Sequence, residues 1–215
     1  IKTLGFRGEA LASIGSVSHL TLISKPEEAE TGAKLSVDGG INSSLTRIAS
    51  PTGTEILVED LFYNVPARLK FLRKDITESR HISGLVTRYA MAYPTIRWIL
   101  THNDATEFQS TGSGDRFEIL QTLFGIQEAK SLMPISFKDR NVSVDGFISD
   151  LTLTRSNRKD ITMFVNGRWV QDANLTAAVI RAYNTMLMVG RYPAVVLFLE
   201  IPTHLVDVNV HPSKA

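Results

Sequence analysis

The stretch GFRGEALASIG, residues 5–15, reads as a glycine-rich turn that runs directly into a short helix. Gly5 and Gly8 permit positive φ angles and a close approach of the backbone to a ligand. The helix that follows would present free N–H groups and a positive dipole end, which together suit a phosphate. Arg7 could add charge to that site or pair with a carboxylate. A glycine turn that only caps an ordinary helix is the alternative, because this spacing is common.

Strands and helices are expected along the chain after this turn. Alternating or short apolar runs predict strands, Gly39-Gly40 predicts a hairpin turn, and Pro66 pre-sets the first turn of a helix. In the first half of the chain we expect strands at 20–24, 33–37, 54–58 and 96–100, and helices at 66–73 and 76–92. Thr54, beside Gly53 at a strand entry, could bind phosphate or simply begin the strand.

The second half predicts a different arrangement. Residues 110–114 read STGSG and are the best candidate for a linker. A helix is expected from 115 to 124 with Gly125 after its end, and a second helix from 174 to 189. Strands are expected at 135–137, 142–147, 161–165, 194–201 and 206–210. Strand, long helix and strand in this order predict a βαβ crossover.

Two basic clusters are candidates for contact with nucleic acid. The first comprises Arg68, Lys70, Arg73 and Lys74, on and just past a short helix that would bury Phe71 and Leu72. The second lies on a polar loop and the next turn, at Arg155, Arg158, Lys159 and Arg168. Cationic faces can hold a phosphate backbone. Most such faces are only solvated surface, however, and the second cluster could be a mobile loop.

Composition excludes several classes of function. The 215 residues are 43% hydrophobic and 21% charged, which is ordinary for a globular protein with real cores. No stretch approaches the roughly 18 to 20 apolar residues of a membrane span, so no membrane partner is expected. Cysteine is absent, and the five histidines show no metal-binding spacing. We therefore expect no metal site, and nothing indicates nucleophilic catalysis.

Four stretches, taken in order, resemble the MutL family of GHKL ATPases. They are LGFRGEALASIGSVSHLTL (4–22), GTEILVEDLFYNVPARLKFLR (53–73), FVNGRWV (164–170) and VDVNVHPSK (206–214). The resemblance implies an α+β fold. Residues 1–112 would be the C-terminal part of a GHKL, or Bergerat-type, α/β sandwich that binds ATP. Residues 113–215 would be a second, transducer-like domain of ribosomal-protein type with a left-handed βαβ crossover, although the general rule for such units is right-handed.

The resemblance also assigns site residues. The loop that wraps the ATP phosphates would comprise Gly5, Arg7, Gly8, Glu9, Ala10 and Leu11. Thr54 would lie near the nucleotide, and Lys214 would be the catalytic lysine that reaches the γ-phosphate. By itself Lys214, after a strand and Pro212, could also be a solvated surface lysine. Arg73 and Arg168 match positions of a DNA-facing groove, and Arg68 and Lys70 accompany Arg73 on the same helix.

The family's general-base glutamate, its magnesium-binding asparagine and its adenine-binding D-x-G motif precede the GFRGEAL loop. Only Ile1 to Leu4 precede that loop here. We therefore expect an internal piece of a longer protein that lacks the main ligands of ATP and Mg²⁺ and does not hydrolyse ATP alone.

The function implied by the resemblance is DNA mismatch repair. An ATP-dependent clamp would hold DNA and signal between mismatch recognition and strand incision. Its partners would be DNA, a second copy of the protein on ATP binding, the mismatch-recognition protein MutS and a downstream endonuclease. It would act in a bacterial-type cytoplasm or at the nucleoid. One alternative is a nucleotide-independent DNA-binding or interaction fragment. Another is a different GHKL enzyme such as gyrase B, against which FYNVPARLKFL argues.

Overall fold

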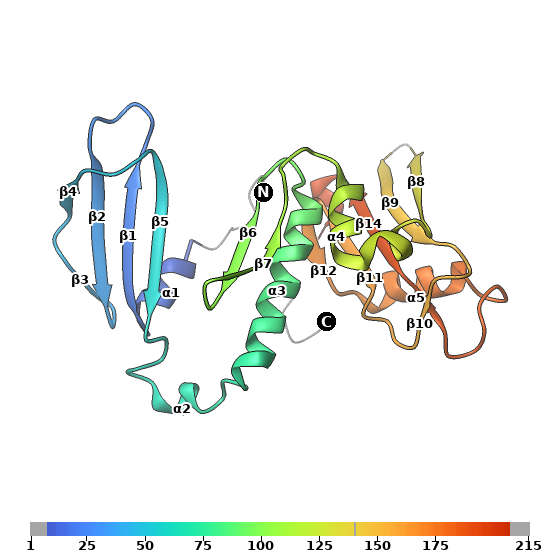
Figure 1. The fold of residues 1–215 in the computed structure, drawn as a ribbon, viewed down its shortest axis with the longest axis horizontal. Helices are drawn as coiled ribbons and strands as arrows, with labels where there is room; N and C mark the ends of the chain where they lie inside the picture. The colour runs from blue at the N-terminus through green and yellow to red at the C-terminus, as the bar shows by residue number, and fades with distance from the viewer. Residues whose placement is uncertain (1–7, 140, 207–215) are drawn as a thin grey trace. The chain divides into compact units, whose positions relative to one another are not determined.

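The computed structural model describes residues 8–139 and 141–206, and it divides the chain into two compact units (Figure 1). Within the described residues, the N-terminal unit comprises residues 8–78, and the C-terminal unit comprises residues 79–139 and 141–206. The expected domain boundary near residue 112 falls inside the C-terminal unit. It stays a prediction.

The N-terminal unit is built on one antiparallel sheet in which β1 pairs with β2 on one side and β5 on the other. The strand order is β3-β2-β1-β5, and β4 also pairs with β2. The elements are α1 Ala10–Gly15, β1 His19–Lys25, β2 Gly32–Asp38, β3 Ile41–Asn42, β4 Thr46–Ile48, β5 Gly53–Glu59 and α2 Pro66–Leu69. The strands expected at 20–24, 33–37 and 54–58 are confirmed, as is the turn at Gly39-Gly40, where both φ angles are positive.

The region after β5 differs from expectation. Helix α2 ends at Leu69, whereas the sequence predicted a helix to residue 73. Phe71 and Leu72 were expected to be buried, but their exposed fractions are 85% and 43%. The expectation was wrong because both residues lie past the end of α2 and so are not on the face of a helix that packs against a core.

The C-terminal unit holds a five-stranded sheet of order β12-β11-β14-β9-β8. Strands β11 and β14 are parallel, with α5 between them in sequence, so the expected βαβ unit is present. The remaining elements of this unit, with α3 beginning at the end of the N-terminal unit, follow in chain order. They are α3 Asp75–Ala92, β6 Ile99–His102, β7 Ala105–Gln109, α4 Arg116–Ala129, β8 Leu132–Asp139, β9 Val142–Ser149, β10 Thr154–Arg155, β11 Ile161–Val165, β12 Arg168–Val170, α5 Ala173–Ala182, β13 Tyr192–Pro193, β14 Val195–Glu200 and the 3₁₀ helix η1 Thr203–Leu205.

The core of the C-terminal unit lies where α3 and α4 meet the sheet. Phe164 on β11 is fully buried and stacks on Phe198 of β14, with ring centroids 5.0 Å apart. The core includes Ala90 of α3, Leu120 of α4 and Val196 of β14. Gly146 on β9 faces Leu197, and a Cβ there would lie 2.1 Å from the Val196 carbonyl oxygen. Only glycine lets these two strands approach so closely.

Two helix ends differ from the sequence prediction. Gly125 has φ 78°, which breaks α4 as expected, but the helix resumes and runs to Ala129. Helix α5 ends at Ala182 and not near 189. The chain cannot continue as a right-handed helix there because Thr185 has φ 69°. The strand expected at 206–210 lies almost wholly outside the described residues.

Candidate functional site

The described part of the glycine-rich loop presents an open helix start. Gly8 has φ 68° and no atom within 4 Å of the position of a Cβ, so a ligand can approach its backbone. Glu9 is the N-cap of α1 but makes no side-chain capping bond, and Ala10 and Leu11 are exposed. The first N–H groups of a helix have no intrahelical acceptors. This arrangement fits an anion; Gly5 and Arg7 lie outside the described residues.

Thr54 is placed near the start of β5. Its hydroxyl lies 2.8 Å from the Ser24 hydroxyl across the β1–β5 pair. Helix α1 leads into the other end of the pair at His19, which faces Glu59. Ser24 lies five positions after His19, which corresponds to about 17 Å along the strand axis. A ligand that contacts both the loop and Thr54 must therefore be elongated.

The first basic cluster is accessible in the N-terminal unit. Arg68, Lys70 and Arg73 are all exposed on α2 and the segment after it. The Arg73 backbone N–H donates to Glu78 Oε1 at 3.1 Å, which holds the chain between α2 and α3. Arg168 begins β12 in the C-terminal unit and is half-buried. That these four residues share one groove stays a prediction.

A polar cluster that the sequence analysis missed fixes the turn before α2. Asp38 Oδ1 lies 2.9 Å from His19 Nδ1 and accepts a 2.6 Å bond from the Tyr63 hydroxyl. That hydrogen bond to the carboxylate raises the pKa of Tyr63. The Tyr63 ring also stacks on His19 at 4.2 Å. Asp60 and Phe62, both at positive φ, shape this turn. No local spacing pattern links residues so far apart.

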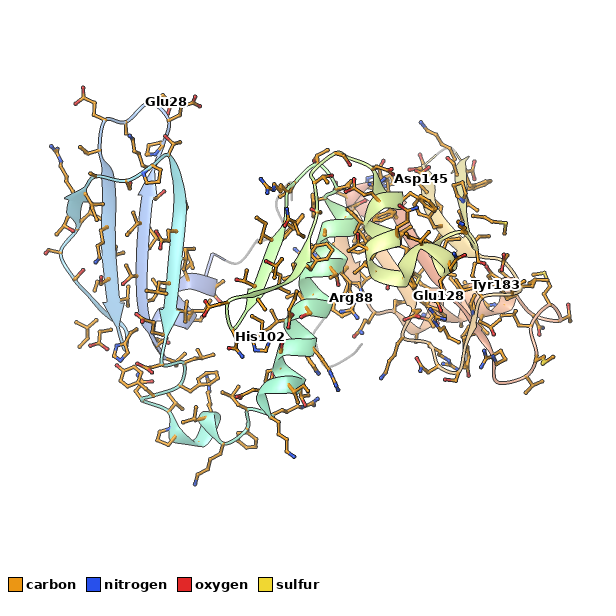
Figure 2. The ribbon with its side chains drawn as sticks, viewed as in Figure 1. Glu28, Arg88, His102, Glu128, Asp145 and Tyr183 are labelled. Atoms are coloured by element: carbon orange, nitrogen blue, oxygen red, sulfur yellow. The ribbon has the colours of Figure 1, made fainter. Side chains whose placement is uncertain are left out.

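Arg155, one of the second basic cluster, is engaged by two carboxylates. Its Nη1 and Nη2 donate to Glu128 at 3.1 and 2.5 Å, and its Nε donates to Asp160 at 2.5 Å (Glu128 is labelled in Figure 2). The bidentate hydrogen bond to Arg155 lowers the pKa of Glu128. Such planar, charge-assisted pairs are the strong ones. Arg155 therefore fastens α4 to the 155–160 loop and is not free to meet a phosphate.

This ion pair predicts a specific acid sensitivity. The pKa of Glu128 is depressed in the folded state, so its stabilising contribution is present above the ordinary value of 4.5 and is lost as pH falls below it. We expect Arg155→Gln to lower the free energy of unfolding at pH 7 by about 1 kcal/mol, since the pair is partly solvated. Urea denaturation at pH 7 and pH 3 should show the two proteins converging at low pH. A constant difference would contradict this prediction.

Within residues 8–139 and 141–206, no cluster of three or more histidine, aspartate or glutamate side chains is arranged to hold a metal ion. Across the same described part of the chain, no helix is long and apolar enough to cross a membrane.

Comparison with known proteins gives consistent matches. A family model described as "DNA mismatch repair protein, C-terminal domain" matches residues 120–215. The chain is similar to the DNA mismatch repair protein MutL of Streptococcus thermophilus, with 42% identity over 214 residues, which is 100% of this chain and 33% of that protein. The chain thus spans about a third of the length of the curated relatives it matches.

Solved structures match as well. An Aquifex aeolicus MutL ATPase domain complexed with ADP is 28% identical, with a TM-score of 0.73 over 90% of this chain and 72% of that one. The gyrase B subunit of Myxococcus xanthus has a TM-score of 0.56 over 94% of this chain and 62% of its own, at 10% identity. The second likeness shows a common α+β fold alone.

Proposed function

We propose that this chain, which belongs to the MutL family of DNA mismatch repair proteins, is part of an ATP-dependent clamp that holds DNA and signals between mismatch recognition and strand incision. The observation that carries the proposal is the 42% identity to a MutL protein over 214 residues, which is the whole of this chain. The MutL ATPase domain of Aquifex aeolicus, which is 28% identical to this chain, is complexed with ADP in its solved structure, and this supports a nucleotide in the same region here.

The nucleotide would lie along the N-terminal sheet. The open start of α1 and the left-handed Gly8 suit its phosphates, together with Gly5, Arg7, Glu9, Ala10 and Leu11. Thr54, at the far end of the β1–β5 pair, would contact the other end of the nucleotide. Lys214 would add a point charge at the terminal phosphate. Bound ATP would supply the negatively charged terminal phosphate that the lysine contacts. The main ligands of Mg²⁺ would come from the family's upstream motifs.

The DNA contact would use Arg68, Lys70, Arg73 and Arg168. The first three are exposed on one short segment, so they could contact the DNA backbone without any rearrangement of the protein core. We propose that ATP brings two copies together around the DNA, and that MutS and an endonuclease are its partners in a bacterial cytoplasm or nucleoid. We also propose that the domain boundary lies near residue 112 and that the β11–α5–β14 crossover is left-handed, as in the family.

Binding to DNA tests this function. We expect the intact protein to bind all sequences alike, with an affinity that falls steeply with salt, because neutralised phosphates release counterions. Arg73→Glu should weaken binding to every sequence and reduce the salt slope by about 1, which fluorescence anisotropy can measure. Arg47→Glu is the matched control, since Arg47 is exposed on β4 of the same unit.

Two outcomes would contradict the assignment. Salt-insensitive binding, or binding that depends on base sequence, would show that these basic residues do not form the DNA-binding groove. If a non-hydrolysable ATP analogue leaves retention on circular DNA unchanged, the alternative of a nucleotide-independent DNA-binding module is favoured.

A further inference from the structure

Helix α1 follows the glycine-rich loop directly and leads into β1 (Figure 1). Gly15, in its last turn, is the one buried residue of the helix, and a Cβ there would lie 3.0 Å from the Val37 side chain. The residues from Ala10 to Ser13 are all exposed. The direction of α1, and with it the place of the loop before it, therefore depends on how its last turn is fastened.

Four successive carbonyl groups at and just past this end, those of residues 14–17, each accept a hydrogen bond from beyond the helix. Carbonyl groups at the end of a helix have no partner inside it, so these donors decide how the end is held. The first two bonds come from residue 18 and from the β2–β3 hairpin. The other two come from the turn after β5. The Asn64 side-chain amide donates to the Ser16 carbonyl at 3.0 Å, and the Phe62 N–H donates to the Val17 carbonyl at 2.6 Å.

The turn that supplies these two donors is itself locked to the sheet. Tyr63 donates its hydroxyl to Asp38 at 2.6 Å and stacks its ring on His19. Gly39 leaves the space that the turn occupies, because a Cβ at this glycine would lie 2.6 Å from the Tyr63 hydroxyl and 3.2 Å from the Asn64 amide nitrogen. The Asn64 side chain is thus held between the sheet and the end of α1.

The backbone of the same turn is strained. Asp60 and Phe62 have φ angles of 49° and 68°, and a bulky side chain is rarely found in this left-handed region. Such conformations persist only where the surrounding contacts impose them, and they gather at functional sites. Here the strained backbone directs the Phe62 N–H and the Asn64 side chain toward the end of α1.

We propose that Asn64 and Tyr63 are positioning residues for the phosphates of the nucleotide. Asn64 fixes the last turn of α1, Tyr63 fixes Asn64, and both act through the loop of residues 5–11 without contact to the nucleotide. The inference rests on the proposed function, which assigns that loop to the phosphates. A helix of six residues is about 9 Å long, so a tilt of about 10° at its fastened end displaces its start by about 1.5 Å. Hydrogen bonds to phosphate tolerate only a few tenths of an ångström.

The test compares a ligand that has phosphates with one that has none. The intact protein is titrated calorimetrically with a non-hydrolysable ATP analogue and, separately, with adenosine. Asn64→Ala should weaken binding of the analogue by about 10-fold, which corresponds to the loss of one or two well-placed hydrogen bonds to a charged group. Binding of adenosine should stay unchanged, because the loop would contact only the phosphates.

Tyr63→Phe is the milder variant, since it keeps the ring against His19 and removes only the hydroxyl. It should weaken binding of the analogue by about 3-fold and should add little in the Asn64→Ala background, because both changes act on the same contact. Asn42→Ala, at an exposed position on β3 of the same unit, is the matched control and should leave both affinities unchanged.

The outcomes separate this inference from the proposed function. Equal losses for the analogue and for adenosine would show that the two residues only support the fold, and the inference would be wrong. It would also be wrong if Asn64→Ala binds the analogue normally while Arg7→Ala, in the loop itself, weakens it; the nucleotide site would then stand. If the original protein binds neither ligand, the proposed function fails as well. Should Asn64→Ala not fold, Tyr63→Phe decides by the same comparison of the two ligands.

Discussion

Replacing Phe164 with alanine is expected to lower the free energy of unfolding by about 3–5 kcal/mol, a large share of what a domain of this size has. The ring is fully buried and stacks on Phe198 at 5.0 Å. It lies on β11, one of the two parallel strands, and belongs to the core that includes Leu120 and Val196. Its removal leaves a cavity that these well-packed neighbours can only partly fill. Urea denaturation followed by circular dichroism measures the loss.

The matched control is Phe137→Ala, on β8 of the same sheet. Its side chain is 62% exposed, so the same change of residue type should cost within about 1 kcal/mol. Similar losses in the two variants would contradict the assignment of the core, because burial would then not decide the cost.

The parts of the fold that could be predicted depend on local patterns. Gly39-Gly40 and Asn166-Gly167 specify tight turns by their tolerance of positive φ, and both turns are present. Strand β11 was predicted because a short apolar run is bounded by turn residues, and the structure gives Ile161–Val165. Such signals act within a few residues, so one sequence suffices to recognise them.

What could not be predicted depends on partners distant in sequence. Arg155 looked like a residue for DNA because its own loop is basic; its acceptor Glu128 lies 27 residues away on α4. Phe71 was expected to be buried because apolar residues of a helix usually face a core. Its exposed fraction of 85% shows that its side chain does not pack into a core. Helix α5 was expected to run to about residue 189, but Thr185 has φ 69° and the Tyr183 hydroxyl donates a 2.6 Å bond to the Ser149 carbonyl, 34 residues away.

In the candidate site, too, local features could be predicted from the sequence and contacts between distant residues could not. Gly8 could be assigned from a local motif, and its φ of 68° agrees with the expected turn. The pairing of Arg88 with Trp169 has no sequence signal, because 81 residues separate them and only the fold brings them within 4.3 Å. A glycine turn is therefore visible in a single sequence, whereas a contact between residues distant in sequence is not.

Replacing Lys214 with alanine in the intact protein is expected to reduce ATP turnover by roughly 10²-fold, the usual cost of removing a preorganised charge at a transferring phosphate. The hypothesis rests on the match of VDVNVHPSK to the family's phosphate lysine; this residue lies outside the described part of the structure. The γ-phosphate is the charge that distinguishes ATP from ADP, so a lysine that contacts it acts on hydrolysis and senses which nucleotide is bound.

Nucleotide affinity and turnover must be measured separately on the same preparation. ATP affinity should change little with Lys214→Ala, because the GFRGEAL loop and the upstream pocket would hold most of the nucleotide. Lys138→Ala, at an exposed position on β8, is the control for the loss of one lysine and should leave both quantities unchanged. If turnover survives Lys214→Ala, or if affinity and turnover fall together, Lys214 does not act on the γ-phosphate in the transition state. The resemblance would then identify the family without identifying this residue's role.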